Sequence, residues 1–389
     1  MTAKIPKHWK IKKLGEIGVF FKGKGVPKNK ITDTGFKCLT YGDLYTKYDF
    51  VIEGVKSFID KETALISQEI RYGDICFAGS GETLEDIGKC ATFIDDEIGY
   101  AGGDIIVFRT EQNPIVMSYL LNSDIAKKQK FSMGQGHSVV HIYSSQLEML
   151  KLPLPPLEEQ EKIAEILLTC DKAIRLTTQI ITQLKQRNQG LSQQLLTGEK
   201  RVKGFEKSIW KSFSISEICK IGRGRVISAK YISENKGIYP VYSSQTQNEG
   251  VFGKINTYDF EGEYITWTTD GVNAGTVSFR EGKFNCTNVC GTLKVIDVNN
   301  FSHKFLAYKL ATIAFQYVSY TLANPKLMNN TMGDIIIDLP EIDEQNAIAQ
   351  ILDTAHQELK LYEQKLQLLQ AQKKTLMQKL LTGEVLTIK

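Results

Sequence analysis

The stretch that decides the fold occurs twice. Residues 154–199 begin LPPLEEQEKIAEILLTC and end LSQQLLTGE, and residues 339–384 begin LPEIDEQNAIAQILDTA and end LMQKLLTGE. Gln160 and Gln345 lie 185 residues apart, as do Gly198 and Gly383, so the two copies align without a gap. A repeat that occurs only twice, and this far apart, is not one turn of a solenoid. It predicts two copies of one structural unit, each following a different, larger segment.

Each copy predicts a long helix. Pro155 and Pro340 stand just before it, where a helix can begin, and Gly198 and Gly383 fit helix ends. Apolar residues recur at alternating spacings of three and four, which is the seam of a coiled coil. A few polar positions such as Asn188 restrict its register. Because a seam needs a partner, we expect the two copies to pair; the alternative is two helices packed on separate cores. The predicted seam residues are Leu167, Ile174, Ile181, Leu184, Leu191, Leu352, Leu359, Leu366, Leu369 and Leu376.

Length and charge bound the class of protein. A chain of 389 residues, 42% hydrophobic and 24% charged, predicts more than one domain with ample core. The net charge of +4 is small, but it is unevenly distributed. Residues 1–30 carry nine lysines and one acid, and residues 200–230 carry nine Lys or Arg and two acids. Basic stretches that open both halves suggest contact with a polyanion, against the alternative of a lysine-rich solvated surface.

The seven cysteines contain no closely spaced CxxC pair, which favours a reducing, cytoplasmic setting. The first eleven residues lack the apolar core of a signal peptide. The sequence has no run of eighteen apolar residues, so we expect no membrane span.

The variable segments before the two helices are predicted to be strand-rich α+β domains. In the first, strand signals lie at residues 38–41, 74–77, 91–94 and 104–108, with a helix from Pro114 to about Lys130. In the second they lie at residues 239–242, 264–267, 275–279 and 293–296, with a helix from Phe305 to about Val318. The predicted boundaries are a first domain at 1–152, a helix at 153–199, a second domain at 200–337 and a helix at 338–389.

Motifs for catalysis are weak. Residues 21–25 have the F-x-G-x-G form of a methyl-donor loop, and residues 18–24 have the G-x-x-x-x-G-K form of a P-loop, but Gly25 replaces the required Ser or Thr. His137 and His141 are four apart, as are Cys286 and Cys290, yet neither pair has a second pair to complete a zinc site. We therefore predict no catalytic residue, metal or cofactor in this chain.

The sequence better supports DNA recognition, which needs cations for phosphates and polar side chains for base edges. Lysines in one half and Arg or Lys in the other supply the first requirement, and polar, glycine-containing turns supply the second. Taken singly, each turn is equally an ordinary polar loop. The predicted DNA-binding residues are Lys22, Lys24, Lys28, Lys30, Ser80, Gln135, His137 and Ser138 in the first half, and Arg223, Arg225, Lys230, Ser243, Ser244, Gln245, Thr269, Asp270, Asn273, Asn324 and Lys326 in the second.

Over its whole length the sequence resembles the specificity subunit of type I restriction-modification systems. The repeated L-P-x-L/I-x-E-Q and L-L-T-G-E motifs carry the resemblance, together with Trp9–Ile17, its counterpart Trp210–Ile218, and residues 136–142 and 323–327. The resemblance implies two target recognition domains, each reading half of a split, asymmetric double-stranded DNA site. It also implies an antiparallel pair of helices as the spacer between these domains.

The resemblance further implies partners that carry the chemistry. Two modification subunits would methylate adenine with S-adenosylmethionine, and two restriction subunits would use ATP and Mg for translocation and cleavage. The seam from Leu167 to Leu195 would be roughly 42 Å long at about 1.5 Å per residue, comparable to a DNA turn of about 34–36 Å. The alternatives are a stand-alone DNA methyltransferase with a diverged donor loop and a coiled-coil adaptor that does not bind DNA.

Overall fold

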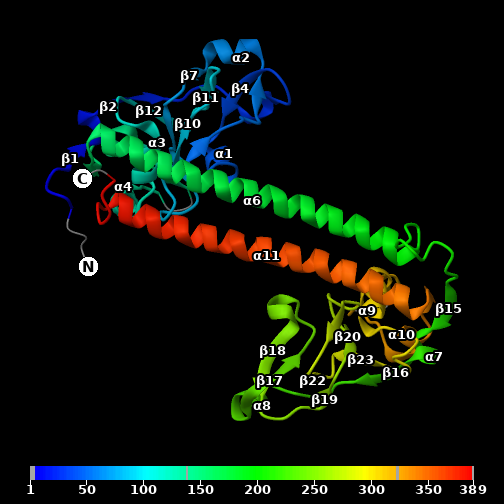
Figure 1. Cartoon of the computed structure of the whole chain (residues 1–389). Coiled ribbons are helices and arrows are strands. Elements are labelled where there is room, and N and C mark those ends of the chain that lie inside the picture. Colours follow the sequence, from blue (N-terminus) through cyan, green and yellow to red (C-terminus); the bar gives the residue numbers. More distant parts are fainter. Residues whose placement is uncertain (1–4, 137–138, 321–323, 388–389) are drawn as a thin grey trace. The chain divides into compact units, whose positions relative to one another are not determined.

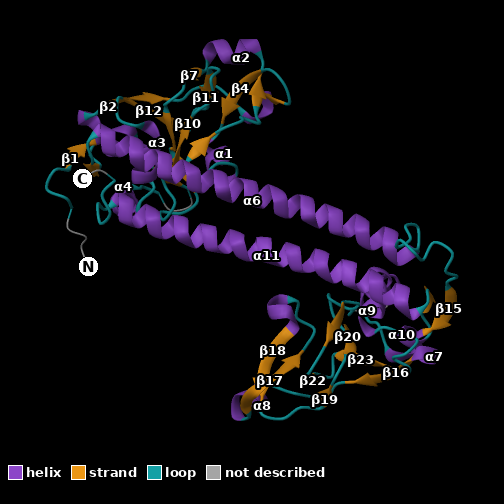
Figure 2. Ribbon diagram, in the orientation of Figure 1, coloured by secondary structure: helices purple, strands orange, loops and turns teal. Residues whose placement is uncertain are grey.

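The computed structural model describes residues 5–136, 139–320 and 324–387, with their helices and strands drawn in Figures 1 and 2. The chain divides into two compact units. Unit 1 comprises Met1–Thr178 and Lys365–Lys389, and unit 2 comprises Gln179–Gln364. Each unit therefore contains one strand-rich domain and a part of each long helix. No helix in the described ranges is long and apolar enough to cross a membrane.

In the described part of unit 1, the main sheet has five strands. Their order is β2 (Gly18–Lys22), β12 (Ile105–Thr110), β8 (Ile75–Ala78), β10 (Cys90–Phe93) and β5 (Val51–Ile52). A second sheet has the order β3 (Ile31–Thr32), β6 (Phe58–Ile59), β4 (Phe36–Leu39), β11 (Gly99–Ala101) and β7 (Gln68–Ile70). Two short pairs are β1 (Lys10–Lys13) with β14 (Lys151–Leu154) and β9 (Ser80–Gly81) with β13 (Val140–His141). The shorter helices are α1 (Tyr41–Thr46), α2 (Lys61–Ile66), α3 (Pro114–Leu121), α4 (Asp124–Met133) and α5 (Ser144–Leu147).

The prediction of one helix from Pro114 to Lys130 is wrong, because the segment forms α3 and α4 with a break at Asn122 and Ser123. The Asn122 side chain donates to the backbone carbonyl of Cys90 at 2.7 Å and accepts from its N–H at 3.2 Å. Ser123 is extended and begins α4 as its N-cap. An asparagine bonded to the neighbouring strand competes with the helix ladder, so the helix ends there.

In the described part of unit 2, the main sheet has four strands in the order β16 (Cys219–Arg223), β23 (Cys290–Val295), β20 (Tyr264–Thr268) and β21 (Val277–Arg280). A second sheet has the order β18 (Val251–Ile255), β17 (Lys236–Tyr242), β22 (Lys283–Cys286) and β19 (Phe260–Glu261), and β15 (Lys211–Ser214) pairs with β24 (Ile336–Leu339). The shorter α-helices are α7 (Ile215–Ile218), α8 (Ala229–Glu234), α9 (His303–Ile313) and α10 (Asn329–Gly333). The predicted helix to Val318 is too long, since α9 ends at Ile313 and a 3-10 turn, Ala314–Tyr317, follows.

The two units share one frame. The two main sheets have the same strand order over three strands, β2–β12–β8 in unit 1 and β16–β23–β20 in unit 2. In both sets each strand is antiparallel to its neighbour. In both units a short outer pair, β1 with β14 or β15 with β24, joins the start of the domain to the strand that precedes a long helix. The helix that follows the middle strand of these three, β12 or β23, is α3 in unit 1 and α9 in unit 2. The internal repeat therefore extends beyond the long helices into the domains.

The long helices α6 (Leu157–Thr197) and α11 (Ile342–Leu381) pair antiparallel within each unit. In unit 1, Asp171 forms an ion pair with Lys373, and the Glu159 carbonyl accepts from Thr387. Lower-numbered residues of α6 therefore contact higher-numbered residues of the C-terminal segment, so the two segments run in opposite directions. In unit 2, Lys185 pairs with Glu363 at 2.9 Å and Arg187 with Glu358 at 2.7 Å. The predicted fold class, two α+β domains with an antiparallel helical pair, is confirmed.

The predicted seam residues face inward to different degrees. Leu167, Ile181, Leu184 and Leu352 are buried, and the other predicted seam residues are half-buried. The glycine after each helix is in the left-handed conformation, with φ of +76° at Gly198 and +71° at Gly383. A Cβ at Gly383 would lie 2.2 Å from Pro6, so this helix end requires glycine for space as well as for backbone conformation.

The Glu-Gln dipeptide of the repeat fastens each long helix to its domain. The Gln160 side chain accepts from the N–H of Asn113, the N-cap of α3, at 2.9 Å and donates to the carbonyl of Pro155 at 2.8 Å. Gln345 accepts from the N–H of Ser302, the N-cap of α9, at 2.9 Å and donates to the carbonyl of Pro340 at 2.8 Å. The same side chain therefore joins the start of a long helix to the start of a domain helix in both units.

The buried glutamates just before these glutamines bind different partners. Glu159 accepts from the indole N–H of Trp9 at 3.0 Å and from His8 at 3.1 Å. Glu344 forms a two-point ion pair with the Arg201 guanidinium, at 2.8 and 2.7 Å. In each unit the carboxylate ties a long helix to the segment that enters the domain, which explains why the repeat keeps a charged group in a buried place.

Candidate nucleic-acid interface

The candidate site lies at one end of each main sheet, where three strands meet. In unit 1 the chain leaves β2 through Gly23, whose N–H donates to the Ile105 carbonyl at 2.8 Å. A Cβ at Gly23 would lie 2.0 Å from the carbonyl oxygen of Gly102. In unit 2 the chain leaves β16 through Gly224, whose N–H donates to the Cys290 carbonyl at 3.0 Å. Glycine at this turn brings Lys22 in unit 1, or Arg223 in unit 2, to the sheet end.

A second turn lies at the same end of each main sheet, after β8 in unit 1 and after β20 in unit 2. Beyond β8, Gly79 donates its N–H to the Asp104 carbonyl at 2.8 Å, and its own carbonyl accepts from Ile142 at 3.0 Å. Beyond β20, Thr269 donates to the Val289 carbonyl at 2.9 Å, and its carbonyl accepts from Leu327 at 2.9 Å. These matched bonds place Ser80 beside His141 in unit 1 and Asp270 beside Lys326 in unit 2.

The paired side chains differ in chemistry although their places correspond. Ser80 Oγ and His141 Nδ1 are 3.0 Å apart in a hydrogen bond. The Asp270 Oδ1 atom lies 3.5 Å from Lys326 Nζ. Unit 1 therefore has a hydroxyl–imidazole pair at the position where unit 2 has an ion pair.

Arg223 completes a charged cluster in unit 2. Its Nε donates to the carbonyl of Asn288 at 2.6 Å, and its Nη2 lies 3.2 Å from Asp270 Oδ2. The Thr269 hydroxyl donates to the same Asp270 oxygen at 2.6 Å. The Asp270 carboxylate thus holds two cations, Arg223 and Lys326, each with 37% of its side chain exposed. This arrangement presents fixed N–H donors to solvent.

Further predicted residues of unit 2 surround this cluster, several of them with internal partners. Asn273 donates to the Ser244 carbonyl at 2.8 Å, and Ser243 accepts from Thr287 at 3.2 Å. The Gln245 amide donates to the Val251 carbonyl at 2.5 Å. The Asn273 bond joins the turns at 243–245 and 270–273. The turns are therefore held in place by the same polar side chains that were predicted to read DNA.

Other predicted residues lie apart from the cluster or add only exposed charge. Arg225 is paired with Asp259 at 2.8 Å and lies over the Tyr231 ring, and Lys230 on α8 is exposed and 3.9 Å from Glu234. Asn324 is exposed two residues before Lys326. In unit 1, Lys22, Lys24, Lys28 and Lys30 are exposed, and Gln135 exchanges two backbone hydrogen bonds with His141. His137 and Ser138 lie outside the described residues.

Two residues at these ends were not predicted as DNA contacts. His141 was considered only as half of a metal pair, but it is the partner of Ser80. Val272 is 92% exposed at the tip of the Asp270–Asn273 turn. The sequence signal that could have identified Val272 is its position as an apolar residue between Gly271 and Asn273.

The cofactor-like motifs have other geometry. The F-x-G-x-G segment begins in β2, an antiparallel neighbour of β12, and leads through Pro27 into a 3-10 turn at Lys28–Lys30. A P-loop or a methyl-donor loop instead joins a strand to a helix. Within the described ranges, no group of three His, Cys, Asp or Glu side chains is placed to hold a metal ion. Cys286 and Cys290 are buried.

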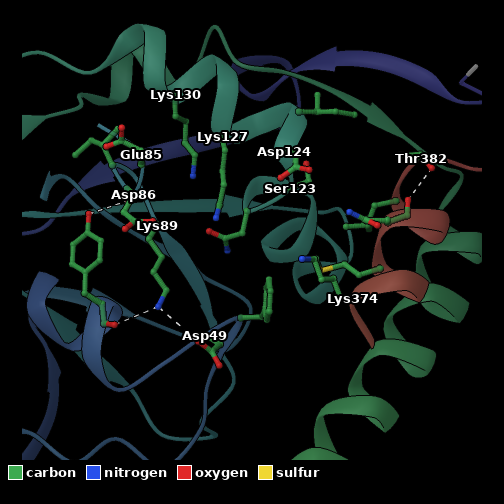
Figure 3. A pocket seen from close by; sticks show the side chains of 18 residues that line it. Asp49, Glu85, Asp86, Lys89, Ser123, Asp124, Lys127, Lys130, Lys374 and Thr382 are labelled. Atoms are coloured by element: carbon green, nitrogen blue, oxygen red, sulfur yellow. Dashed lines mark hydrogen bonds and ion pairs between the residues drawn. The ribbon is translucent and has the colours of Figure 1, made fainter. Parts of the chain in front are cut away.

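A separate cavity of about 690 Å³ lies in unit 1, between the domain and the last turns of α11 (Figure 3). Lys130, only 2% exposed, donates to the Gly88 carbonyl at 2.6 Å, and burial lowers its pKa to about 8. Charges of both signs line the cavity, so it does not present a surface of one sign to an anion. The charged residues in its wall are Lys89, Lys127, Lys130, Lys374, Asp49, Glu85, Asp86 and Asp124.

Comparison with known proteins agrees with this architecture. The family model described as "Type I restriction modification DNA specificity domain" matches twice, over residues 6–186 and 207–371. The chain therefore belongs to the family of type I restriction-modification specificity subunits. The matched family is a non-catalytic DNA specificity domain and is distinct from a methyltransferase domain.

Similar proteins carry the same description. The chain is 40% identical over 210 residues to the putative type I specificity subunit S.MpnORF615P of Mycoplasma pneumoniae, covering 53% of this chain and 81% of that protein. It is 43% identical over 143 residues to the type I restriction enzyme MpnII specificity subunit of the same organism, covering 37% of this chain and 43% of that protein.

Solved structures show the same fold. The S subunit of a type I restriction-modification system from M. genitalium matches 98% of this chain and 99% of its own length, with a TM-score of 0.69 and 16% identity. The HsdS subunit from Thermoanaerobacter tengcongensis matches 98% of both chains, with a TM-score of 0.50 and 17% identity. At these identities the likeness concerns the fold alone.

Proposed function

We propose that this chain reads a split DNA site and assembles the subunits that act on it. The domains at 1–152 and 200–337 are the two target recognition domains, and each reads one half-site. The helices at 153–199 and 338–389 are the spacer. The chain itself performs no chemistry.

This proposal rests on the end of the main sheet that has the same arrangement in both units. In two units with the same strand order, the matched strands β2 and β16 end in a basic residue, Lys22 or Arg223, and the turn beyond β8 or β20 carries a polar pair. A protein that reads two different half-sites requires such a frame, constant in backbone and variable in side chain. Cations position the duplex through phosphates, and polar side chains at fixed places distinguish base edges.

Exposed cations supply the phosphate contacts in this proposal. Lys24, Lys28 and Lys30 in unit 1 and Lys230 in unit 2 are exposed, so they can neutralise phosphates without breaking a buried interaction. Such contacts add affinity that is independent of sequence and falls steeply with salt. Neutralising any one of them is expected to weaken binding to all sequences alike.

The proposed partners supply the chemistry that this chain lacks. Two modification subunits, with S-adenosylmethionine, dock on the helical frame and methylate adenine, and two restriction subunits supply ATP- and Mg-dependent cleavage. The complex acts in the cytoplasm on double-stranded DNA. The seam residues of α6 and α11 hold the spacer at one length, so the distance between half-sites is a property of this chain.

Selection from a random duplex library tests the proposal. The chain is assembled with its modification subunit, bound duplexes are recovered, and the enriched sequences are aligned. We expect two short blocks at a constant spacing. Enrichment of a single block, or of no sequence, would contradict the proposal, as would methyl transfer to DNA by the purified chain alone.

A further inference from the structure

The two sheet ends correspond residue by residue. The bond from Ile142 to Gly79 in unit 1 matches the bond from Leu327 to Thr269 in unit 2. The antiparallel partners that follow are Ser80 with His141 and Asp270 with Lys326. Lys22 and Arg223 end the matched strands β2 and β16. Corresponding positions on two readers of one duplex meet corresponding positions of the two half-sites.

Unit 2 offers donors at this position. Asp270 Oδ2 accepts from Thr269 and lies against Arg223, and Oδ1 lies against Lys326. Because neighbouring donors engage both carboxylate oxygens, Asp270 acts as a positioning residue that orients two cations. The groups that remain to contact DNA are N–H donors of Arg223 and Lys326. In the major groove, adjacent acceptors N7 and O6 belong to guanine, the usual partner of Arg and Lys.

Unit 1 offers a hydroxyl–imidazole pair at the same position. Ser80 is buried, and its hydroxyl shares a hydrogen bond with Nδ1 of His141. The second imidazole nitrogen, Nε2, can donate or accept according to the tautomer. A single imidazole nitrogen lacks the two-cation donor set of unit 2, so its base preference differs.

We propose that these pairs determine the base read at equivalent positions of the two half-sites, and that the Arg223–Asp270–Lys326 cluster requires guanine. The proposal rests on the function proposed above, because it assigns a base preference to that same interface. Val272, exposed on the same turn, lies next to the cluster in sequence and supplies an apolar contact to the neighbouring base pair.

Exchange of the pair tests this inference. The double variant D270S/K326H gives unit 2 the side chains of unit 1. The full-length parent and variant, each with the modification subunit, select duplexes from the same random library. We expect guanine at one position of one half-site to lose about 5- to 150-fold of its preference, the range for one good base contact. The other half-site and the spacing stay unchanged.

Two further variants separate base reading from other roles. K326R keeps both donor cations and is expected to retain the guanine preference. K326M removes one of the two donor cations and is expected to reduce that preference. K230A removes an exposed lysine on α8 and is expected to lower binding of all sequences by a similar factor. Thermal unfolding of each variant shows whether the fold is retained.

The outcomes distinguish this inference from the proposed function. A parent that selects no bipartite site refutes the proposed function. A parent that selects a bipartite site without guanine in the unit 2 half, or a folded K326M or D270S/K326H variant that leaves the motif unchanged, refutes only the inference. An equal loss of binding to every sequence in K326M also refutes it, because the cluster would then contact phosphates.

Discussion

Asn188 on α6 donates its side-chain amide to the backbone carbonyl of Ala355 on α11 at 2.8 Å. Both residues lie in unit 2, and both are buried in the helical seam. The Asn188 side-chain oxygen also accepts from Arg187, which is paired with Glu358. A buried amide in an apolar seam fixes which residues face one another, at a cost in stability.

Replacing this amide with a hydrocarbon tests that role. N188L should raise the free energy of unfolding, since leucine fills the seam and the Ala355 carbonyl keeps its place in the helix ladder. The same change should permit other pairings, including association between chains. Urea unfolding measures the first effect, and light scattering after size-exclusion chromatography measures the second. Lower stability in a chain of unchanged mass would argue against a register role.

Removing the glutamine clamp should destabilise either unit. Q160A leaves the Asn113 N–H and the Pro155 carbonyl without their side-chain partner, and Q345A does the same to Ser302 and Pro340. We expect a loss of about 1–3 kcal/mol for each variant in urea unfolding, the cost of buried groups left unpaired. Q193A, at an exposed position of α6, is the control and should change stability by less than about 0.5 kcal/mol. Equal effects at Gln193 and Gln160 would contradict the clamp.

The buried Lys130 predicts a dependence of stability on pH. Burial lowers its pKa from 10.5 to about 8, so the unfolded chain binds more protons between these values. The buried, charged Lys130 therefore lowers the free energy of unfolding by its full amount below pH 8. This destabilisation disappears as the pH rises to about 10.5. K130M should remove this dependence. The stability difference between K130M and the parent should fall by up to about 3 kcal/mol from pH 8 to 10.5. A difference that stays constant over that range would contradict the buried charge.

Shortening the spacer should move the half-sites closer. Deleting one heptad from each long helix, residues 175–181 and 364–370, keeps the seam in phase and removes about 10 Å. The spacing between half-sites should fall by about 3 base pairs, and both half-sites should remain as they are. Deleting four residues from each helix breaks the phase and should abolish binding. A heptad deletion that leaves the spacing unchanged would exclude the helices as the spacer.

The helical pair was predictable because its information is local and periodic. Spacings of three and four, as through Leu167, Cys170 and Ile174, predict a seam whatever the rest of the chain does. The strand segments were predictable for a similar reason. The break between α3 and α4 was not, since it depends on the bond of Asn122 to Cys90, which lies thirty-two residues earlier in the chain.

The candidate site was predictable as a set of residue types but not as an arrangement. Asp270 and Lys326 are 56 residues apart, and only the matched bonds at Thr269 and Leu327 bring them together. His141 escaped prediction because its role depends on Ser80, which lies in another turn. Arg225 and Lys230 were expected at the same surface on charge alone, yet each has an acidic neighbour elsewhere. Charge patterns identify candidates, and tertiary hydrogen bonds decide which of them meet.

The methylation pattern of a cell tests the central claim most directly. Genomic DNA is sequenced for methyladenine from cells that express the modification subunit with and without this chain. The account predicts one split motif, two fixed blocks at constant spacing, that is methylated only when both proteins are present. A continuous motif, or the same methylation in the absence of this chain, would contradict it.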